Sequence, residues 1–378
     1  MKKLKVYLRI PGVADCGVGY YRMWQPMEVA RKNGEVDFKC DEFTWGERGD
    51  ESTNPRKEPT VESVGKQVKW SDVAYFARND VPGYLAEAGG LRDFYLKPTI
   101  LDIDDNVHAT RPYNPGYRCF HPNSENLAYN IKGLGIFDAI TVSTENLKKF
   151  YAQYTDRPIY VCPNSMDFTE RDKILKKKFT SELYKKGKDE IRIGWSGSAS
   201  HWENLKHIEK PLIEILKKYP NTTFYYTGLF GDLFKDPEIQ GRVKSVGWSG
   251  LKKWPERNKE MNFDIALAPL TDNDFNRAKS NLRVLEYATA QFAVIASPVE
   301  PYNCFTSKEV IFAKEKHEWF DAIESLILDK KKRKSLADNL YKRCKKDFNI
   351  DKNYKIWLKA INEVCQKFSH NLSKAKLK

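Results

Sequence analysis

Cations and hydroxyl groups gather in the segment from Asn276 to Ser297, which reads NRAKSNLRVLEYATAQFAVIAS. The second half of the segment is apolar and predicts a buried helix followed by a strand. The first half places arginine, lysine and serine side chains around the start of that helix. A helix start already favours an anion through its free backbone N–H groups and its dipole, so cations at this position indicate phosphate groups. This segment therefore predicts a binding site for a phosphate-bearing ligand.

The predicted helix runs from about Ala278 to Ala290, with Lys279 and Ser280 in its first turn. Glu286 follows Lys279 by seven positions, or two helical turns, so both side chains should face the same side. A cation near phosphates and a carboxylate that accepts from ribose hydroxyls together suit a nucleotide diphosphate. We predict that Lys279, Ser280, Arg283 and Glu286 bind it. The alternative is an exposed Lys/Glu helix face, against which the apolar half of the segment argues.

Two turns rich in small residues predict further contacts with the anion. In the first turn, PGVADCGVGYYR (11–22), Gly17 and Gly19 allow a ligand to approach the backbone closely. Arg22 lies in the first turn of the helix that follows. A tight connection between a strand and a helix also needs glycines, so this spacing is weak evidence by itself. We include these three residues in the predicted ligand site.

The second turn lies in GWSGSASHWENL (194–205). Gly197 and the small residues after it can build a nest of backbone N–H groups, and Ser198 or Ser200 can cap the next helix. A plain helix cap beside a solvated His201 is the alternative. Because the two turns occupy equivalent places in the two halves of the chain, we predict that Gly197, Ser198 and His201 also bind the anion.

A third group of side chains follows a predicted strand in LDIDDNVHAT (101–110). Asp104 and Asp105 can supply a base or orient a hydroxyl, and His108 can contact a substrate hydroxyl. Together with Asp102 the two carboxylates could instead hold a divalent cation. The Asp-x-Asp spacing also occurs in phosphatases that form an aspartyl phosphate, but there it follows the first strand and here about the fourth. We predict an acidic loop that lines the ligand cleft.

The elements that carry these residues alternate between strand-like and helix-like runs, in two series. This order predicts an α/β fold with two doubly wound parallel sheets, in which ligands bind outside the carboxyl ends of the strands. We predict a first domain over residues 1–170, a lysine-rich connection over 171–190 and a second domain over 191–350. A final helix and a basic tail occupy 351–378. Apolar residues from Tyr354 to Phe368 recur at spacings of three and four and form one stripe that needs a surface to cover.

The composition fits a globular chain of two domains. Its 378 residues exceed one ordinary core, and 41% of them are hydrophobic. Every apolar run is short compared with the ~20 residues of a membrane-spanning helix, and the N-terminus is typical of a strand, not of a signal peptide. The seven cysteines show no CxxC spacing, which predicts a reduced, cytoplasmic protein without structural zinc. The net charge of +13 suits an anionic partner.

At these residues the sequence resembles the GT-B glycosyltransferases, and within them the retaining enzymes of glycosyltransferase family 4 (glycosyl transferases group 1). The resemblance extends over nearly the whole chain and is strongest from Phe137 to Tyr302. Its segments follow in the family's order: FDAITVSTENLKKFY, PIYVCPNSMD, IRIGWSGS, DIALAPL and NRAKSNLRVLEYATAQFAVIASPVEPY. The resemblance implies two Rossmann-like domains facing a central cleft, with the donor bound mainly by the second and the acceptor mainly by the first. It also implies a C-terminal helix that crosses back to the first domain.

The family's pattern carries over onto single positions. Glu286 matches the second glutamate of an E-x7-E pattern, which holds the donor ribose. Gly197 matches the phosphate-binding turn of the second domain, while Gly17 and Gly19 match the glycine loop of the first.

Two departures from the family stand out. Ala278 occupies the position of the first glutamate, so the usual contact with the donor sugar is missing or made elsewhere. The arginine and lysine that usually follow the second glycine turn are not recognisable. Lys279, Arg283 or Arg22 take over their positive charge in our prediction.

We therefore predict a glycosyltransferase, transferring a hexosyl or pentosyl group from a nucleotide-diphosphate sugar to an acceptor hydroxyl. The resemblance implies retention of configuration, and no metal or other cofactor is expected because fixed cations stabilise the leaving phosphate. Asp104, Asp105, His108 and Lys279 are the predicted catalytic residues. The expected acceptor is a glycan or glycolipid precursor. The basic charge keeps open a DNA acceptor with a hydroxymethylated base, and Ala278 keeps open a non-catalytic nucleotide- or nucleic-acid-binding protein.

Overall fold

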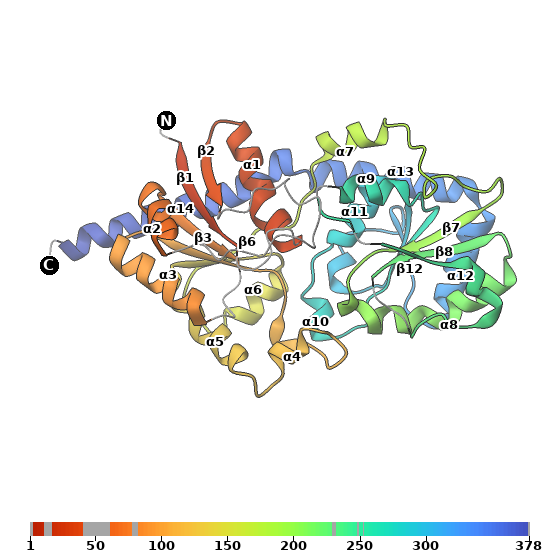
Figure 1. Ribbon diagram of the computed structural model, residues 1–378, viewed down its shortest axis with the longest axis horizontal. Coiled ribbons are helices and arrows are strands. Elements are labelled where there is room, and N and C mark those ends of the chain that lie inside the picture. Colours follow the sequence, from red (N-terminus) through yellow and green to blue (C-terminus); the bar gives the residue numbers. More distant parts are fainter. Residues whose placement is uncertain are drawn as a thin grey trace.

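The computed structural model describes residues 3–10, 17–40, 61–77, 82–228, 232–247, 249–251 and 253–376. Figure 1 shows two α/β halves side by side, the first built from the N-terminal part of the chain and the second from the C-terminal part. Each half contains a parallel sheet surrounded by helices. The predicted fold class is therefore confirmed. None of the helices in the described ranges combines the length and the apolar character that a bilayer crossing requires.

The sheet of the first half has six parallel strands in the order β2-β1-β3-β4-β5-β6. Short apolar runs form them, and the central strands are buried on both faces, as a parallel sheet covered by helices requires. The order reverses between β1 and β3, which places the loop after β1 at the position where such sheets bind ligands. The strands are β1 (Leu4–Arg9), β2 (Val36–Cys40), β3 (Val73–Ala77), β4 (Thr99–Ile103), β5 (Ala139–Val142) and β6 (Ile159–Val161).

The sheet of the second half also has six parallel strands, in the order β12-β11-β10-β7-β8-β9. Here the order reverses between β7 and β10, so the loops after these two strands open beside each other. They are two of the segments that the sequence analysis predicts to bind the anion. The strands are β7 (Ile191–Trp195), β8 (Thr222–Thr227), β9 (Val243–Val246), β10 (Ile265–Ala268), β11 (Ala293–Ala296) and β12 (Val310–Phe312).

Helices pack on both sheets and carry most of the remaining core. The longer ones are α1 (Gln25–Lys32), α2 (Val61–Trp70), α3 (Pro82–Tyr95), α5 (Glu125–Leu134), α6 (Glu145–Tyr151), α7 (Phe168–Leu175), α8 (Trp202–Lys218), α9 (Trp254–Glu260), α11 (Leu282–Ala290), α12 (Lys316–Leu328), α13 (Lys330–Asp347) and α14 (Ile350–Lys376). The short ones are η1 (Val18–Trp24), η2 (Val107–Ala109), α4 (Tyr117–Phe120), η3 (Ala199–His201), η4 (Pro237–Arg242), α10 (Asp274–Arg277) and η5 (Glu300–Tyr302).

The last helix, α14, joins the two halves. It starts beside the second half and runs back along the first, where it packs against α1 (Figure 1). Trp357 is fully buried, and its Nε1 donates a hydrogen bond to the carbonyl oxygen of Arg22 at 3.0 Å. Tyr354, Leu358, Ile361 and Val364 join the same apolar cluster as the strands of the first sheet. The predicted apolar stripe thus covers the first domain.

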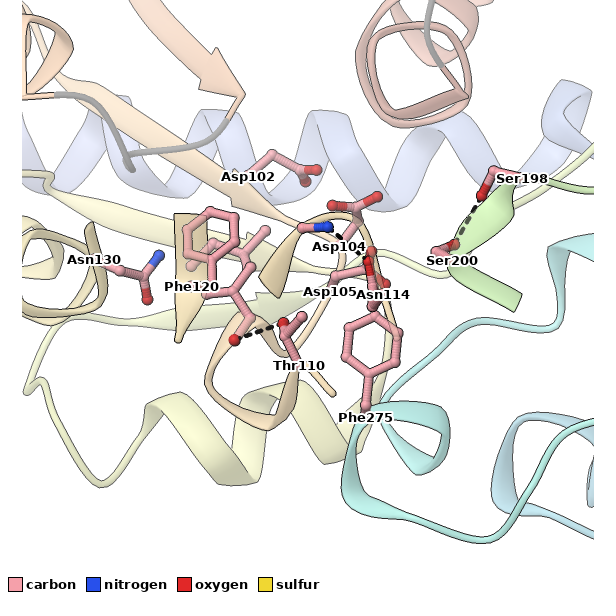
Figure 2. Close-up of a pocket in the computed structure, with 13 residues that line it drawn as sticks. Asp102, Asp104, Asp105, Thr110, Asn114, Phe120, Asn130, Ser198, Ser200 and Phe275 are labelled. Carbon is pink, nitrogen blue, oxygen red and sulfur yellow. Dashed lines mark hydrogen bonds between the residues drawn. The ribbon is translucent and has the colours of Figure 1, made fainter. Parts of the chain in front are cut away.

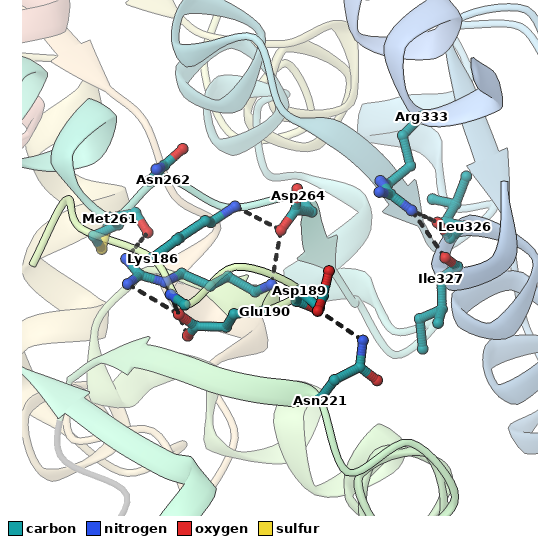
Figure 3. A network of polar contacts seen from close by, with 12 residues as sticks. Lys186, Asp189, Glu190, Asn221, Met261, Asn262, Asp264, Leu326, Ile327 and Arg333 are labelled. Carbon is teal, nitrogen blue, oxygen red and sulfur yellow. Dashed lines mark hydrogen bonds and ion pairs between the residues drawn. The ribbon is translucent and has the colours of Figure 1, made fainter. Parts of the chain in front are cut away.

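The connection between the sheets is more ordered than its lysine-rich sequence predicts. Arg171 is buried within α7, and residues further along contact the second domain. Figure 3 shows the Lys186 ammonium directed at Asp264, 2.6 Å away, and the Asn221 amide at the carbonyl of Asp189. The Arg192 guanidinium pairs with Glu190 at 3.1 Å. These contacts fasten the connection to the amino ends of β7 and β10, which is the edge of the sheet opposite to the ligand loops.

The predicted helix from about Ala278 to Ala290 lacks its first turn, and a separate short helix precedes it. A short helix, α10, comes first because the Asn273 side chain caps it by accepting from the backbone N–H of Asn276 at 2.9 Å. A non-helical stretch then precedes α11, which begins only at Leu282. Lys279 and Ser280 lie in that stretch. Their placement in a first helical turn was therefore wrong, and a bend, not helical periodicity, brings Lys279 to the same cavity as Glu286.

Candidate functional site

A cavity of about 480 Å³ lies in the cleft between the two halves. The first half contributes η1 and the loop after β4, and the second contributes the loops after β7 and β10 together with α11. Most predicted site residues line it: Gly17, Arg22, Asp104, Asp105, Gly197, Ser198, His201, Lys279, Ser280, Arg283 and Glu286. Gly19 and His108 are absent from its described lining.

Arg283 presents an incompletely satisfied cation to the cavity. Its guanidinium lies over the ring of Trp195, with Cζ 4.6 Å from the ring centre. Its Nη1 is buried, and no described group accepts a hydrogen bond from it. A buried charged group without a partner is costly, so this arrangement favours an anion in the cavity.

Gly197 makes room for that cation. A Cβ atom at this position would lie 2.5 Å from Nη2 of Arg283 and 2.6 Å from the Trp195 ring, which is closer than such atoms approach. Glycine is therefore required by close packing. Its N–H donates to the Thr227 hydroxyl at 3.1 Å, so this member of the predicted N–H nest is already used within the protein.

No side chain caps η3 or α8, the two helices that follow Gly197. The hydroxyls of Ser198 and Ser200 bond to each other at 2.7 Å, and neither accepts from the start of η3 or α8. The prediction that one of them caps the helix was wrong, because Ser198 precedes the 3-10 turn η3, Ser200 lies within it, and α8 starts only at Trp202. Both side chains instead line the cavity.

His201 faces the cavity as a neutral hydrogen-bond donor. Asn204 Oδ1 accepts from the backbone and hydroxyl of Thr271 and from Asn276, so its Nδ2 is the atom that donates to His201 Nδ1, at 2.9 Å. With Nδ1 acting as the acceptor, the proton of the neutral ring resides on Nε2. Burial, and then the nearby Arg283 and Lys279 cations, hold the pKa of His201 well below its usual 6.5.

Lys279 bridges the two halves. Its Nζ lies 3.2 Å from Oδ1 of Asp105 and 4.3 Å from the centre of the Phe275 ring. Asp105 follows β4 of the first half, whereas Lys279 follows α10 of the second. A second cation thus stands at the cavity wall beside Arg283, and its position depends on a carboxylate from the other half.

Glu286 is held by two donors. Trp254 Nε1 and the Tyr21 hydroxyl both donate to Oε1, at 2.9 and 2.8 Å, and no described group donates to Oε2. Burial raises the pKa of this carboxyl above its usual 4.5, while the hydrogen bond from Tyr21 acts in the opposite direction. One carboxylate oxygen is therefore available to accept from a ligand hydroxyl, as the sequence analysis predicts for Glu286.

Arg22 has another role than the predicted one. Its side chain is 1% exposed and forms a bidentate ion pair with Asp102, with N–O distances of 3.0 and 2.9 Å. Nη1 also donates to Asn164 Oδ1 at 3.1 Å and to the carbonyl of Cys162. Although burial acts to lower it, the ion pair with Asp102 raises the pKa of Arg22. Its charge is already neutralised, so Arg22 does not supply the positive charge expected for a ligand phosphate.

The buried ion pair nevertheless reaches the cavity indirectly. Asn164, which accepts from Arg22, donates from Nδ2 to the Ser280 hydroxyl at 2.8 Å. This chain of bonds holds Ser280 in the cavity wall. Gly17 precedes η1, a wide π-helical turn of the kind often found at functional sites. The remainder of the predicted glycine turn, residues 11–16, lies outside the described residues.

A second cavity of about 270 Å³ adjoins the first and is lined by the predicted acidic loop (Figure 2). Asp104 and Asp105 line both cavities. His108 is absent from the described lining of both cavities. Its Nε2 forms a hydrogen bond with Asn130 Oδ1 at 2.9 Å, and its ring stacks on Tyr154. His108 therefore does not contact a cleft ligand as predicted, because η2 turns its ring towards α5 and α6. Within the described ranges, no three His, Cys, Asp or Glu side chains cluster in a way that could hold a metal ion.

Several residues of the first cavity were not predicted. Tyr21 lies inside a quoted motif, next to Arg22. Trp195, which lies under the Arg283 guanidinium but is not in the described lining, also lies inside a quoted motif, and an aromatic residue at the carboxyl end of β7 was the available signal. Asn164 lies in the segment PIYVCPNSMD, which carries part of the resemblance. Trp254 gave no signal, because only the packing of α9 against α11 brings it to Glu286.

Comparison with known proteins supports the same architecture. Residues 235–359 match a protein family described as glycosyl transferase-like. HepE from Anabaena, solved with UDP, is 14% identical with a TM-score of 0.59 over 98% of this chain and 100% of HepE. A glycosyltransferase from Rickettsia africae is 10% identical with a TM-score of 0.65 over 96% and 99%. TarM from S. aureus is 12% identical with a TM-score of 0.53 over 78% and 58%. No curated protein sequence matches the chain significantly.

The fold and the cleft define a two-domain protein of GT-B architecture. Residues 235–359 match a glycosyl transferase-like family, and the whole chain shares the fold of solved structures that include a glycosyltransferase, while membership of the group 1 glycosyltransferases stays a prediction. Assignment to glycosyltransferase family 4 within that group stays a prediction.

Proposed function

We propose that this chain transfers a sugar from a nucleotide-diphosphate sugar to an acceptor hydroxyl, in the cytoplasm. The single observation that supports this most strongly is Arg283, fixed on Trp195 with a buried nitrogen that lacks a partner. Lys279 and the Nε2–H of His201 line the same cavity. A diphosphate supplies the missing acceptor oxygens, and HepE, which shares the fold, was solved with UDP and with UDP-glucose.

The proposed orientation of the nucleotide follows from Glu286, which lies three residues after Arg283 on α11 and lines the same cavity. Its second oxygen accepts from the ribose hydroxyls, and Leu251, Leu282 and Tyr302 supply apolar surface in the same wall. The diphosphate then lies near Arg283 and Lys279, and the sugar points towards Asp104 and Asp105, where the two cavities meet. Ala278, in the place of the family's first glutamate, is 3% exposed and packs against the first domain, so it cannot contact the sugar.

In the proposed reaction the bond between the anomeric carbon and the diphosphate oxygen breaks, and a bond from that carbon to the acceptor oxygen forms. The proton of the acceptor hydroxyl passes to the leaving diphosphate. Arg283, Lys279 and His201 stabilise the negative charge that develops on the leaving group, which is why a divalent metal is not expected to be essential. Retention of configuration follows from the resemblance, and the transferred group is a hexose or a pentose.

Thermal unfolding with UDP, GDP, ADP, dTDP and CMP tests the binding step. A ligand that binds only the folded protein stabilises it by about 2.7 kcal/mol at a hundredfold excess over its Kd. We expect one diphosphate to raise the melting temperature, and Arg283→Gln to abolish that shift. Arg31→Gln is the matched control, because Arg31 lies on α1 and its guanidinium pairs with Glu28 at the surface.

Turnover is measured separately, by release of the nucleoside diphosphate from the sugar donor that corresponds to the selected nucleotide. Release that requires Glu286 and persists in EDTA supports a metal-independent transferase. A diphosphate shift without any release, with or without Mg²⁺, would point to the non-catalytic binding protein instead. If no nucleotide shifts the melting temperature, the proposed function is wrong.

A further inference from the structure

Two buried asparagines join the loops that follow β7 and β10. Asn204, in the first turn of α8, is 2% exposed, and Asn276, in α10, is 1% exposed. Asn276 Nδ2 donates to Asn204 Oδ1 at 2.9 Å. Buried amides need hydrogen-bond partners, so this pair favours one arrangement of both loops. Neither asparagine is in the described lining of the first cavity, and any effect on a ligand there must pass through another residue.

The backbone of Thr271 determines which way each amide faces. Its N–H can only donate and lies 2.9 Å from Asn204 Oδ1. Its carbonyl oxygen can only accept and lies 2.9 Å from Asn276 Nδ2. An inverted Asn204 amide would place its NH2 group against both the Thr271 N–H and the NH2 group of Asn276. The main chain after β10 therefore fixes the orientation of the Asn204 side chain.

This orientation reaches the first cavity through His201. Asn204 presents Nδ2, a donor, to His201 Nδ1 at 2.9 Å, so the proton of the neutral ring is on Nε2. His201 lines the cavity, and within the described ranges no hydrogen bond involves its Nε2. The ring therefore keeps one N–H group for a ligand.

An uncharged donor suits this position because two cations are already close. Burial, and then the charges of Arg283 and Lys279, lower the pKa of His201 and keep its ring neutral. A neutral ring of the other tautomer would present a lone pair from Nε2 to the oxygens of a diphosphate. The contribution of His201 thus depends on which nitrogen carries the proton.

We propose that Asn204 is a positioning residue for the transfer reaction, which holds the His201 proton on Nε2 so that this nitrogen donates to the leaving diphosphate. The inference rests on the proposed function, because the diphosphate is the acceptor of that hydrogen bond. The same network extends to the Lys279 cation, since the Lys279 backbone N–H donates to the carbonyl oxygen of Asn276 at 3.2 Å.

The tautomer is measured on the ligand-free full chain by ¹⁵N NMR of the histidine rings, with His201→Gln to assign the His201 signals. In mildly alkaline solution, where the ring is neutral, we expect the proton on Nε2 in the unmodified chain. Asn204→Asp should move it to Nδ1, because a carboxylate accepts and cannot donate. A proton on Nδ1 in the unmodified chain, or an unchanged tautomer in Asn204→Asp, would overturn the inference.

The effect on the ligand is measured by isothermal titration calorimetry with the diphosphate and by the kcat of nucleoside diphosphate release. Asn204→Asp should weaken diphosphate binding at least about tenfold, because a hydrogen bond to a charged group is lost. The kcat should also fall, because the leaving group gains negative charge in the transition state. Asn273→Asp is the matched control. It adds the same charge to the same network, keeps an acceptor for the Asn276 N–H, and has no described contact with His201.

A double variant distinguishes action through His201 from a purely structural role. In the His201→Gln background, Asn204→Asp should weaken diphosphate binding no more than Asn273→Asp does. An equal tenfold loss with and without His201 would overturn the inference. If no diphosphate binds the unmodified chain, the proposed function is wrong, whereas the tautomer of the ligand-free chain still shows whether Asn204 controls His201.

Discussion

The Tyr21 hydroxyl donates to Glu286 Oε1 at 2.8 Å across the cleft, although the two residues lie 265 positions apart. Tyr21 belongs to η1 of the first half and Glu286 to α11 of the second. The same carboxylate is expected to hold the ribose through its other oxygen. One side chain, Glu286, therefore takes part both in the contact between the halves and in the proposed nucleotide site.

Tyr21→Phe removes this bond and leaves the ring packing in place. A hydrogen bond to a charged group contributes about 1.5–3 kcal/mol, so we expect the free energy of unfolding to fall by an amount in that range. Urea denaturation measures the change. Tyr154→Phe, at a residue 47% exposed, should have almost no effect. Equal stability of Tyr21→Phe and the unmodified chain would show that the Tyr21 bond contributes nothing in solution.

Arg283→Gln should separate ligand binding from stability. Removing a cation whose buried nitrogen lacks a partner should leave the ligand-free stability almost unchanged or higher. Loss of a buried charge pair with the diphosphate should lower its affinity by about 2–5 kcal/mol, or at least about thirtyfold. Isothermal titration calorimetry and urea denaturation provide the two readouts. A variant that unfolds readily yet binds the diphosphate normally would contradict the assignment.

Arg22→Met should lower the stability of the protein without removing a ligand contact, which is the opposite of the effect expected for Arg283→Gln. It leaves the Asp102 carboxylate buried and unpaired, which costs about 3–5 kcal/mol of stability. The double variant Arg22→Met with Asp102→Leu should recover much of that loss, because both charges are then absent. Urea denaturation of both variants and of the unmodified chain measures the loss and the recovery of stability. Normal stability with lost diphosphate affinity in Arg22→Met would restore the ligand role that the sequence predicts.

His201 should make the protein less stable in acid. Its folded pKa lies well below 6.5, so the unfolded chain binds more protons and the free energy of unfolding falls as the pH drops below about 6.5. His201→Gln should flatten that part of the profile, whereas His370→Gln, at an exposed residue of α14, should not. Urea denaturation at several pH values gives the slopes. Identical slopes for His201→Gln and the unmodified chain would mean that His201 is not buried as described.

Gly197→Ala tests the close approach of Arg283 and Trp195. The new Cβ would displace the guanidinium end or the ring, both within 2.7 Å of it. Overpacking of this kind costs about 1–3 kcal/mol, and we expect diphosphate affinity to fall as well. Thermal unfolding with and without the diphosphate measures both effects. Gly241→Ala is the control, because a Cβ there meets no atom within 4 Å.

The fold could be predicted from the sequence because it depends on local patterns. Short apolar runs alternating with amphipathic ones determine a parallel α/β arrangement in any compact chain. The stripe on α14 was predicted for the same reason, since Tyr354 and Trp357 recur at helical spacing. The segment after β10 was singled out because a cation at a helix start is unusual without an anion. The segment after β7 was singled out because its small residues can build a nest of backbone N–H groups.

The roles of single side chains depended on partners that no local pattern reveals. Arg22 and Arg283 look alike in sequence, as arginines near a predicted helix start. Tertiary packing places the Asp102 carboxylate against the first and the Trp195 ring against the second, so one is a neutralised core residue and the other a cation with a buried nitrogen that no described group accepts from. His108 differs from its prediction in the same way, because α5 brings Asn130 to it.

By itself, the sequence determined the class of fold, the two halves and the segments that meet at the cleft, because hydrophobic periodicity and chain order act over short distances. Only the tertiary structure decided which cation keeps an unpartnered nitrogen among the described residues, that Tyr21 meets Glu286, and that a second cavity adjoins the first. The physical reason is that pairing and desolvation depend on distances of a few ångströms between residues far apart in the chain, such as the 80 positions from Arg22 to Asp102.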